Sequence, residues 1–227
     1  MKKGEKEVNK ITTIIFDAGG VLFDTKTSRL ERITKTLSSR GFTSTEIARA
    51  YSAGEEFYQQ LKNYKWLSTW ADEEEFFDRY YEIIVDNLST NDQYGLRKQL
   101  FHHTHFAVNC VLFDEVKEVL EGLYGHYKLG VISNAFPSMD WIFDLLDIRK
   151  YFDTIILSSK VGTAKPDPVI YQKALESLKV KADECIFIDD KKVNIAACEA
   201  LGFTGIHLDR KLTDLKVITS YLDNNNQ

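Results

Sequence analysis

The sequence predicts an α/β fold in which a parallel sheet is interrupted by a large helical insert. After about residue 112, short apolar runs alternate with helical stretches, a pattern typical of βαβ units. Residues 26 to about 104 instead show helical periodicity without a strand-like run. At 227 residues the chain also exceeds the usual size of one domain, so we expect one domain with an insert or two small domains.

The first strand is predicted in the stretch ITTIIFDAGGVLFDT, residues 11–25. Five of the six residues before Asp17 are β-branched, and the glycine pair Gly19 and Gly20 follows the aspartate closely. This pattern indicates a buried strand that delivers one carboxylate to a tight turn.

Helical spacing and capping signals define the elements of the insert. A first helix is predicted to begin at a capping box formed by Ser28 and Glu31 and to end at Gly41. A second helix begins near Thr43 and Glu46 and extends to Leu61. A third contains an aromatic group that recurs at helical spacing and is interpreted as the core of the insert, namely Phe76, Phe77, Tyr80 and Tyr81.

Two stretches in the insert have more than one interpretation. Residues 101–106, FHHTHF, are interpreted as a linker between the insert and the rest of the chain, with exposed imidazoles. In an extended segment, however, alternation would place His103 and His105 on one face and allow a metal site. Lys65 and Trp66 are either part of the insert's packing or groups that face a substrate.

The remaining strands are predicted from four apolar runs: LGVIS, TIILSS, CIFID and TGIHL. Helices are predicted between them at 113–124, 167–178 and 193–201. Ligands of open parallel sheets bind at the carboxyl ends of the strands, so the residues that follow each run are the candidate site. They are Asp17, Ser133, Asn134, Lys165, Asp189 and Asp190.

These residue types suit a phosphate site. Carboxylates can hold a divalent cation that neutralises two phosphoryl oxygens, while Ser133 and Lys165 hold the third. A carboxylate such as Asp17 can also attack phosphorus and be released by water, which divides a difficult hydrolysis into two easier steps.

Four motifs in this order, DAGGVLFDT, VISNA, VGTAKPDP and FIDDKKVNIAACEALG, resemble those of the haloacid dehalogenase-like hydrolase superfamily. The resemblance covers essentially the whole chain. It implies a Rossmann-like parallel sheet with helices on both faces, formed by residues 1–24 and 105–227. The long separation between the first two motifs implies a helical cap domain at 25–104.

The resemblance also implies roles for individual residues. Asp17 would be the nucleophile of a Mg²⁺-dependent phosphatase that acts on small phosphorylated metabolites, possibly sugar phosphates, through an aspartyl-phosphate. Catalysis would depend on Asp17, Ser133 and Lys165, and the phosphate would be bound by Ser133, Asn134 and Lys165.

The magnesium ligands implied by the resemblance are Asp17, the backbone carbonyl of Gly19, and Asp190. Asp189 and Asn194 would support them without being the main ligands.

The sequence departs from this pattern at Gly19. Phosphatases of the superfamily usually have an aspartate there, which protonates the leaving oxygen and activates water, and a glycine cannot do either. Asp24 is a candidate replacement acid, although its position also suits the start of the cap linker.

Two other functions remain open. A hydrolytic 2-haloacid dehalogenase would use Asp17 on carbon, but that chemistry needs no metal and position 19 lacks the aromatic residue found in those enzymes. A catalytically weak phospho-ligand binding protein would be consistent with Gly19.

Charge and cysteine content restrict partners and location. The net charge of −5, without a basic stripe, argues against nucleic acid or an anionic membrane as a partner. The three cysteines show no metal or redox spacing, which indicates a reduced cytoplasmic setting. The apolar run before Asp17 is too short for a signal peptide or a membrane span. The sequence does not predict an oligomeric state.

Overall fold

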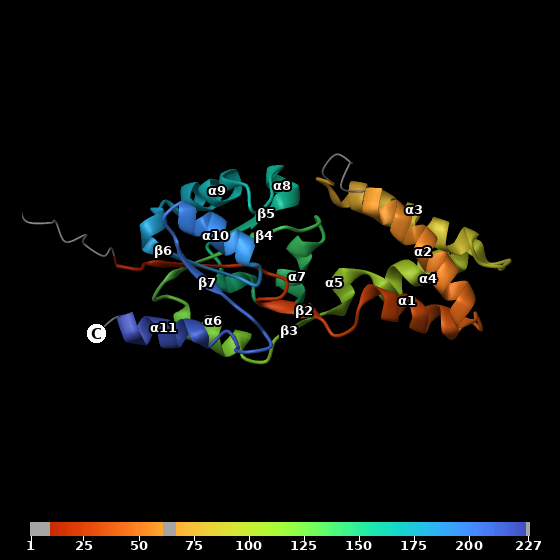
Figure 1. Cartoon of the computed structure of the whole chain (residues 1–227), viewed down its shortest axis with the longest axis horizontal. Coiled ribbons are helices and arrows are strands. Elements are labelled where there is room, and N and C mark those ends of the chain that lie inside the picture. Colours follow the sequence, from red (N-terminus) through yellow and green to blue (C-terminus); the bar gives the residue numbers. More distant parts are fainter. Residues whose placement is uncertain (1–9, 61–66, 226–227) are drawn as a thin grey trace, which may run out of the picture. The chain divides into compact units, whose positions relative to one another are not determined.

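The computed structural model describes residues 10–60 and 67–225, which form two compact units. The α/β unit consists of the described parts of Met1–Asp24, Leu112–Ala135 and Phe143–Gln227. The helical unit consists of the described parts of Thr25–Val111 and of Phe136–Ile142. Figure 1 shows the elements of both units.

The α/β unit is built on a five-stranded parallel sheet with the order β5-β4-β1-β6-β7. Its strands are β1 (Thr13–Phe16), β4 (Lys128–Ser133), β5 (Thr154–Leu157), β6 (Cys185–Asp189) and β7 (Thr204–His207). All five were predicted from apolar runs, and the predicted α/β class with a parallel sheet is confirmed. The strand before Asp17 lies in the centre of the sheet, where both of its faces are buried.

Helices cover both faces of this sheet (Figure 1). The predicted helices correspond to α6 (Val116–Leu123), α9 (Pro168–Leu178) and α10 (Lys192–Ala200). On one face, Tyr171 of α9 and Cys198 of α10 pack in a cluster with Ile15, Ile132 and Phe187 of the strands. This cluster follows from the alternation of side chains along each strand, which directs every second residue to the same face.

Several short elements were not predicted. They are α7 (Met139–Leu145), α8 (Ser158–Val161), α11 (Val217–Asn225) and the strands β2 (Phe23–Thr25) and β3 (Cys110–Leu112), which pair with each other. Two short 3₁₀ turns, Arg149–Tyr151 and Ala182–Glu184, complete the unit. Runs of three or four residues are too short to show a period, which is why most of these elements have no recognisable sequence pattern.

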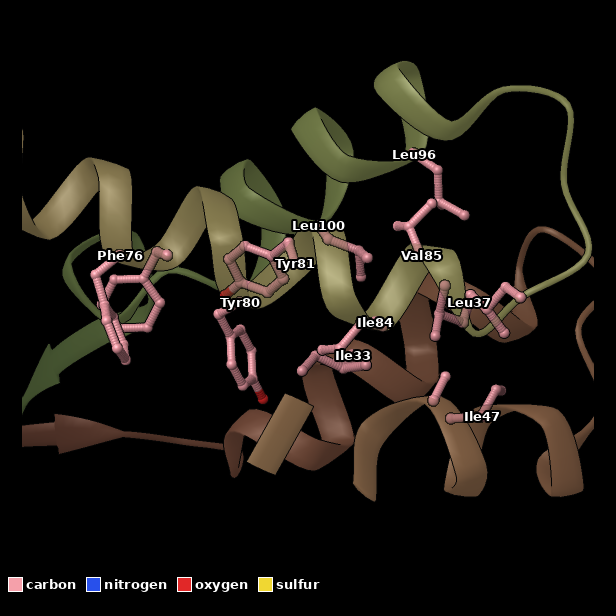
Figure 2. Close-up of a cluster of buried hydrophobic side chains, with 13 residues drawn as sticks. Ile33, Leu37, Ile47, Phe76, Tyr80, Tyr81, Ile84, Val85, Leu96 and Leu100 are labelled. Carbon is pink, nitrogen blue, oxygen red and sulfur yellow. The ribbon is translucent and has the colours of Figure 1, made fainter. Parts of the chain in front are cut away.

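The helical unit contains α1 (Arg29–Ser38), α2 (Ser44–Gln60), α3 (Trp70–Asp86), α4 (Gln93–Thr104) and α5 (Phe106–Asn109). The predicted capping box is present, because Glu31 N–H donates to Ser28 Oγ and Ser28 N–H donates to the Glu31 carboxylate. The predicted aromatic group of α3 is buried together with aliphatic residues of α1, α2 and α4 (Figure 2). Leu61, Lys65 and Trp66 lie outside the described residues.

The prediction of a linker at residues 101–106 was wrong, although His102 and His103 are exposed as expected. Phe101–Thr104 is the last turn of α4, and His105, which was expected to be exposed, is 6% exposed. Its ring contacts those of Trp70, Phe77 and Phe101, and its Nε2 lies 3.2 Å from Oε1 of Glu73. Burial therefore comes from aromatic partners in other helices, which a local pattern does not reveal.

Glu73 also fixes the second segment of the helical unit. The N–H and Oγ–H of Ser138 donate to its carboxylate at 2.7 and 2.6 Å. Phe136 packs on Phe77 in the same unit. None of the helices within 10–60 and 67–225 has the length and apolar character needed to cross a membrane.

Candidate active site

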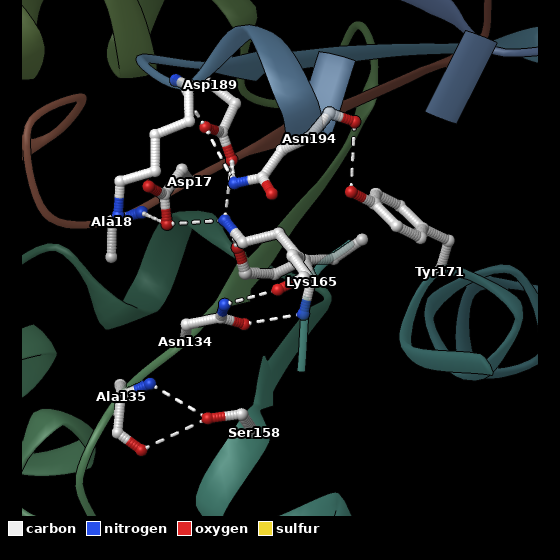
Figure 3. Close-up of polar contacts among 11 residues, drawn as sticks. Asp17, Ala18, Asn134, Ala135, Ser158, Lys165, Tyr171, Asp189 and Asn194 are labelled. Atoms are coloured by element: carbon white, nitrogen blue, oxygen red, sulfur yellow. Dashed lines mark hydrogen bonds and ion pairs between the residues drawn. The ribbon is translucent and has the colours of Figure 1, made fainter. Parts of the chain in front are cut away.

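Polar side chains predicted to form the site do gather at the carboxyl edge of the sheet. Asp17 directly follows β1, Ser133 ends β4, and Asp189 ends β6 with Asp190 next to it. Because β1 lies between β4 and β6 in a parallel sheet, these ends lie side by side. Figure 3 shows Asp17, Asn134, Lys165, Asp189 and Asn194 within one network of contacts.

Lys165 is at the centre of this network. Its Nζ lies 2.7 Å from Oδ1 of Asp17 and 2.7 Å from Oδ2 of Asp189, and it donates to the Ile132 carbonyl at 2.7 Å. An ammonium group has three N–H donors, so all three have a partner. The residue is 5% exposed, which means that its charge is buried and is balanced by two carboxylates.

Asn134 holds Lys165 in this position. Its Nδ2 donates to the Lys165 carbonyl and its Oδ1 accepts from the Lys165 N–H, both at 2.7 Å. The Asn134 side chain, predicted to contact phosphate, therefore holds the backbone of Lys165. Ser133, predicted to contact phosphate as well, is 2% exposed at the end of β4.

Asp189 is held by donors from α10 and the loop before it. Its carboxylate accepts from Asn194 Nδ2 at 2.9 and 3.0 Å and from the Lys191 N–H at 2.7 Å. The hydroxyl of Tyr171 in turn donates to the Asn194 carbonyl at 3.0 Å. Asp189 and Asn194 thus form a rigid support for Lys165.

Three carboxylates of the site could hold a cation. Asp17, Asp189 and Asp190 each provide one oxygen, and these oxygens lie within 4.8 Å of one another. The buried Oδ1 of Asp190 has no hydrogen-bond partner among the described residues. A buried carboxylate oxygen without a donor is costly unless another positive group satisfies it.

The electrostatics of the carboxylates favour a cation as well. Burial raises the pKa of Asp17, and the negative charge of Asp189 raises it as well. The positive charge of Lys165 lowers it, but the pKa of Asp17 is still above its ordinary value. Burial and the charge of Asp189 raise the pKa of Asp190. A divalent cation would stabilise the charged forms of both carboxylates. The donor set therefore fits Mg²⁺, which prefers carboxylate and carbonyl oxygens.

The two glycines after Asp17 have different structural roles. Gly20 has φ of +78°, and a Cβ built on it would lie 2.9 Å from Oδ2 of Asp190, so this position requires glycine. Gly19 does not have a positive φ, and a Cβ built there would meet no atom within 4 Å. The backbone therefore does not require a glycine at position 19, and the missing side chain leaves space beside Asp17.

Sequence reasoning missed the contribution of residues 207–210, at the end of β7. His207 Nε2 lies 3.1 Å from the Asp190 carbonyl, and Arg210 donates to the carbonyls of Gly20 and Val21. The run TGIHL had been identified as a strand, so the rule that strand ends carry function would have pointed to these residues too. Asp24, the other candidate acid, lies in β2.

Comparisons with known proteins agree with this fold. Residues 11–202 match the haloacid dehalogenase-like hydrolase family. The chain is 26% identical over 199 residues to the phosphorylated carbohydrates phosphatase of Thermotoga maritima, covering 86% of this chain and 83% of that protein. It is 24% identical over 209 residues to the phosphoglycolate phosphatase of Photorhabdus laumondii, covering 87% and 80% respectively.

A solved structure shows the same fold. The HAD family enzyme bt-2542 from Bacteroides thetaiotaomicron, in complex with magnesium and inorganic phosphate, has a TM-score of 0.67 and 22% identity, covering 92% of this chain and 98% of that one. The resemblance based on the four motifs is thus confirmed. This chain belongs to the haloacid dehalogenase-like hydrolase family.

Proposed function

We propose that this protein is a Mg²⁺-dependent phosphatase of small phosphorylated metabolites, sugar phosphates among them, and that it acts through an aspartyl-phosphate on Asp17. The observation that carries the proposal is the contact between Lys165 and Asp17 within a cluster of three carboxylates, in which Oδ1 of Asp190 has no hydrogen-bond donor among the described residues. The names of the two relatives, both phosphatases that match most of this chain, support it.

Each residue has a defined task in the proposed reaction. One oxygen of Asp17 attacks phosphorus, the bond from phosphorus to the ester oxygen breaks, and the alcohol oxygen leaves with the electron pair. Water then attacks the phosphorus of the aspartyl-phosphate, which releases inorganic phosphate and regenerates the carboxylate.

The phosphoryl oxygens need positive partners throughout these two steps. Lys165 supplies a buried positive charge, and Ser133 and the backbone of Asn134 supply hydrogen-bond donors at the end of β4. When bound by Asp17, the Gly19 carbonyl and Asp190, Mg²⁺ would neutralise phosphoryl oxygens. Asp189 and Asn194 keep Lys165 in place.

The lack of an acidic side chain at Gly19 determines which substrates react fastest. With no carboxylate at this position, the leaving oxygen departs with its negative charge, so substrates with weakly basic leaving groups react fastest. Anomeric sugar phosphates and aryl phosphates belong to this group, whereas phosphates of primary alcohols do not.

A second candidate is a phospho-ligand binding protein with weak catalysis, and Gly19 is the observation that favours it. A hydrolytic dehalogenase fits less well, because Asp190 retains a metal position and position 19 carries no aromatic ring. Turnover of phosphate esters separates the phosphatase from both.

We assign residues 25–104 to a helical cap domain whose side chains determine substrate specificity. We also place the protein in the cytoplasm, because the spacing of Cys110, Cys185 and Cys198 suits neither a metal site nor a redox pair. Burial raises the pKa of both Cys185 and Cys198 to about 12, so their thiols stay protonated and unreactive.

The decisive experiment measures turnover of a panel of phosphate esters by the wild type and by Asp17→Asn. The nearly isosteric variant should fold but lose turnover, because an amide is a poor nucleophile. Asp147→Asn, which changes an exposed aspartate that pairs with Lys150, should remain active. Wild-type rates in Asp17→Asn would exclude the aspartyl-phosphate route, and no turnover by the wild type would favour the binding protein.

A further inference from the structure

Two loops carry the groups proposed to hold Mg²⁺, and one further segment contacts both of them. The loops are the turn after β1, with Gly19 and Gly20, and the end of β6, where Asp190 follows Asp189. The segment is 207–210, at the end of β7. In this segment the Leu208 N–H donates to the Asp189 carbonyl at 3.0 Å, and His207 Nε2 lies 3.1 Å from the Asp190 carbonyl.

Arg210 connects the same segment to the turn after β1. Its Nη2 donates to the Val21 carbonyl and its Nε donates to the Gly20 carbonyl at 3.4 Å. These are the two carbonyls that directly follow Gly19, whose own carbonyl is a proposed ligand. The guanidinium thus reaches across to the turn that carries the nucleophile.

The guanidinium is itself held on its other sides. Its Nη1 forms an ion pair with Glu115, and its Cζ lies 3.8 Å from the centre of the Phe113 ring. The Arg210 side chain is 18% exposed and the Glu115 side chain 12%, so water competes little with these contacts. A planar group with fixed donors and a stacking partner can define the position of two carbonyls.

Gly20 connects this contact to the metal ligands. Its backbone lies so close to Asp190 that an added Cβ would be 2.9 Å from the Asp190 Oδ2. Any shift of the turn therefore changes both the space beside the Asp190 carboxylate and the position of the Gly19 carbonyl. A contact that holds Gly20 in place therefore also holds the distance between the Gly19 carbonyl and the Asp190 carboxylate.

We propose that Arg210 is a positioning residue that sets the geometry of the Mg²⁺ site by holding the carbonyls of Gly20 and Val21. This inference rests on the proposed function, because it requires that Asp17, Gly19 and Asp190 bind the cation. Lysine cannot replace arginine here, since a single ammonium cannot contact both carbonyls and Glu115 in the same plane and has no flat face to stack on Phe113.

The test is calorimetric titration of the folded protein with MgCl₂ alone, without substrate, on the wild type and Arg210→Lys. We expect the Mg²⁺ dissociation constant of Arg210→Lys to rise about tenfold or more, the usual effect of removing a group that orients ligands. In the assay, the Mg²⁺ concentration needed for half-maximal rate should rise by a similar factor, and kcat at saturating Mg²⁺ should largely recover.

Arg149→Lys is a matched control. Arg149 also pairs with an aspartate, Asp144, and lies near an aromatic ring, that of Phe143, but it belongs to the 3₁₀ turn Arg149–Tyr151 and not to segment 207–210. Its Mg²⁺ affinity should equal that of the wild type. If Arg210→Lys does not fold, Phe113→Leu keeps every donor but removes the stacking ring, and a smaller loss of Mg²⁺ affinity is expected.

The outcomes are distinct. Unchanged Mg²⁺ affinity in a folded Arg210→Lys, or in Phe113→Leu when Arg210→Lys is unfolded, overturns the role of Arg210 and leaves the proposed function intact. Absence of Mg²⁺ binding by the wild type overturns the metal site and this inference together. A loss in Arg210→Lys with none in Arg149→Lys supports the inference.

Discussion

Nζ of Lys165 lies 2.7 Å from Oδ1 of Asp17, and the same ammonium group lies 2.7 Å from Oδ2 of Asp189. One buried ammonium group thus contacts both Asp17, the proposed nucleophile, and Asp189, and its single positive charge offsets only part of their negative charge. These two contacts connect the end of β1, the end of β6 and the loop that contains Lys165, three segments that are far apart in the sequence.

Lys165→Met should both destabilise the protein and remove turnover. Removing one partner of a buried ion pair leaves uncompensated charge and typically costs about 3–5 kcal/mol. Urea denaturation measures the loss. Lys128→Met is the control, because Lys128 donates only to the Leu178 carbonyl in the contacts described, and its loss should be about 1 kcal/mol. Equal losses in the two variants would contradict the central role of Lys165.

Activity should disappear with a strong chelator and return with added Mg²⁺. Mg²⁺ should also raise the free energy of unfolding of the wild type by about 2.7 kcal/mol at a concentration 100 times its dissociation constant. Asp190→Asn should lose most of this stabilisation, because it removes the carboxylate with the unsatisfied oxygen. Thermal unfolding with and without MgCl₂ measures it. Full activity in metal-free buffer would argue for the dehalogenase.

Gly19→Asp should make the rate of hydrolysis less dependent on the basicity of the leaving group. The open space and ordinary backbone at Gly19 accept a side chain, so the variant should fold. A carboxylic acid at this position can protonate the leaving oxygen, which typically accelerates poor leaving groups by about 10²–10⁴-fold. Rates across a series of phosphate esters measure the dependence.

Gly19→Asn is the control for this experiment, since it has nearly the same shape but no acidic proton to donate. It should retain the steep dependence of the wild type. An identical slope in all three proteins would mean that another group, such as Asp24, already supplies the proton.

Glu115→Gln should reduce the loss of stability at low pH. Burial raises the pKa of Glu115, but the Leu215 N–H and Arg210 lower it more in sum, so the pKa in the folded state is below its ordinary value of 4.5. The unfolded state therefore binds a proton first as the pH falls. The stability that this carboxylate provides is complete above pH 4.5 and is lost as the pH falls through its lower folded pKa.

The measurement is the free energy of unfolding of both proteins between pH 7 and about pH 3. The difference between wild type and Glu115→Gln should be largest at neutral pH, about 1–3 kcal/mol for a hydrogen-bonded charge, and should shrink toward low pH. A difference independent of pH would show that the charge of Glu115 does not contribute.

Local sequence determined the elements and the place of the site. The strands of the sheet appear as apolar runs, and the first helix begins at Ser28 as its capping box predicts. Since parallel strands all end at one edge, the residues after each run predicted where Asp17, Lys165 and Asp190 meet. These features need only short-range periodicity and the geometry of the sheet.

Only the tertiary structure decided how the side chains are used. The Asn134 side chain holds the Lys165 backbone, His105 is buried among aromatic rings, and Arg210 donates to the Gly20 carbonyl. Each of these contacts joins residues that are distant in the sequence or depends on the conformation of a side chain. A long-range contact and a side-chain conformation both leave no periodic pattern in the sequence. The sequence alone therefore shows which chemical groups reach the edge of the sheet, whereas packing decides which group each one contacts.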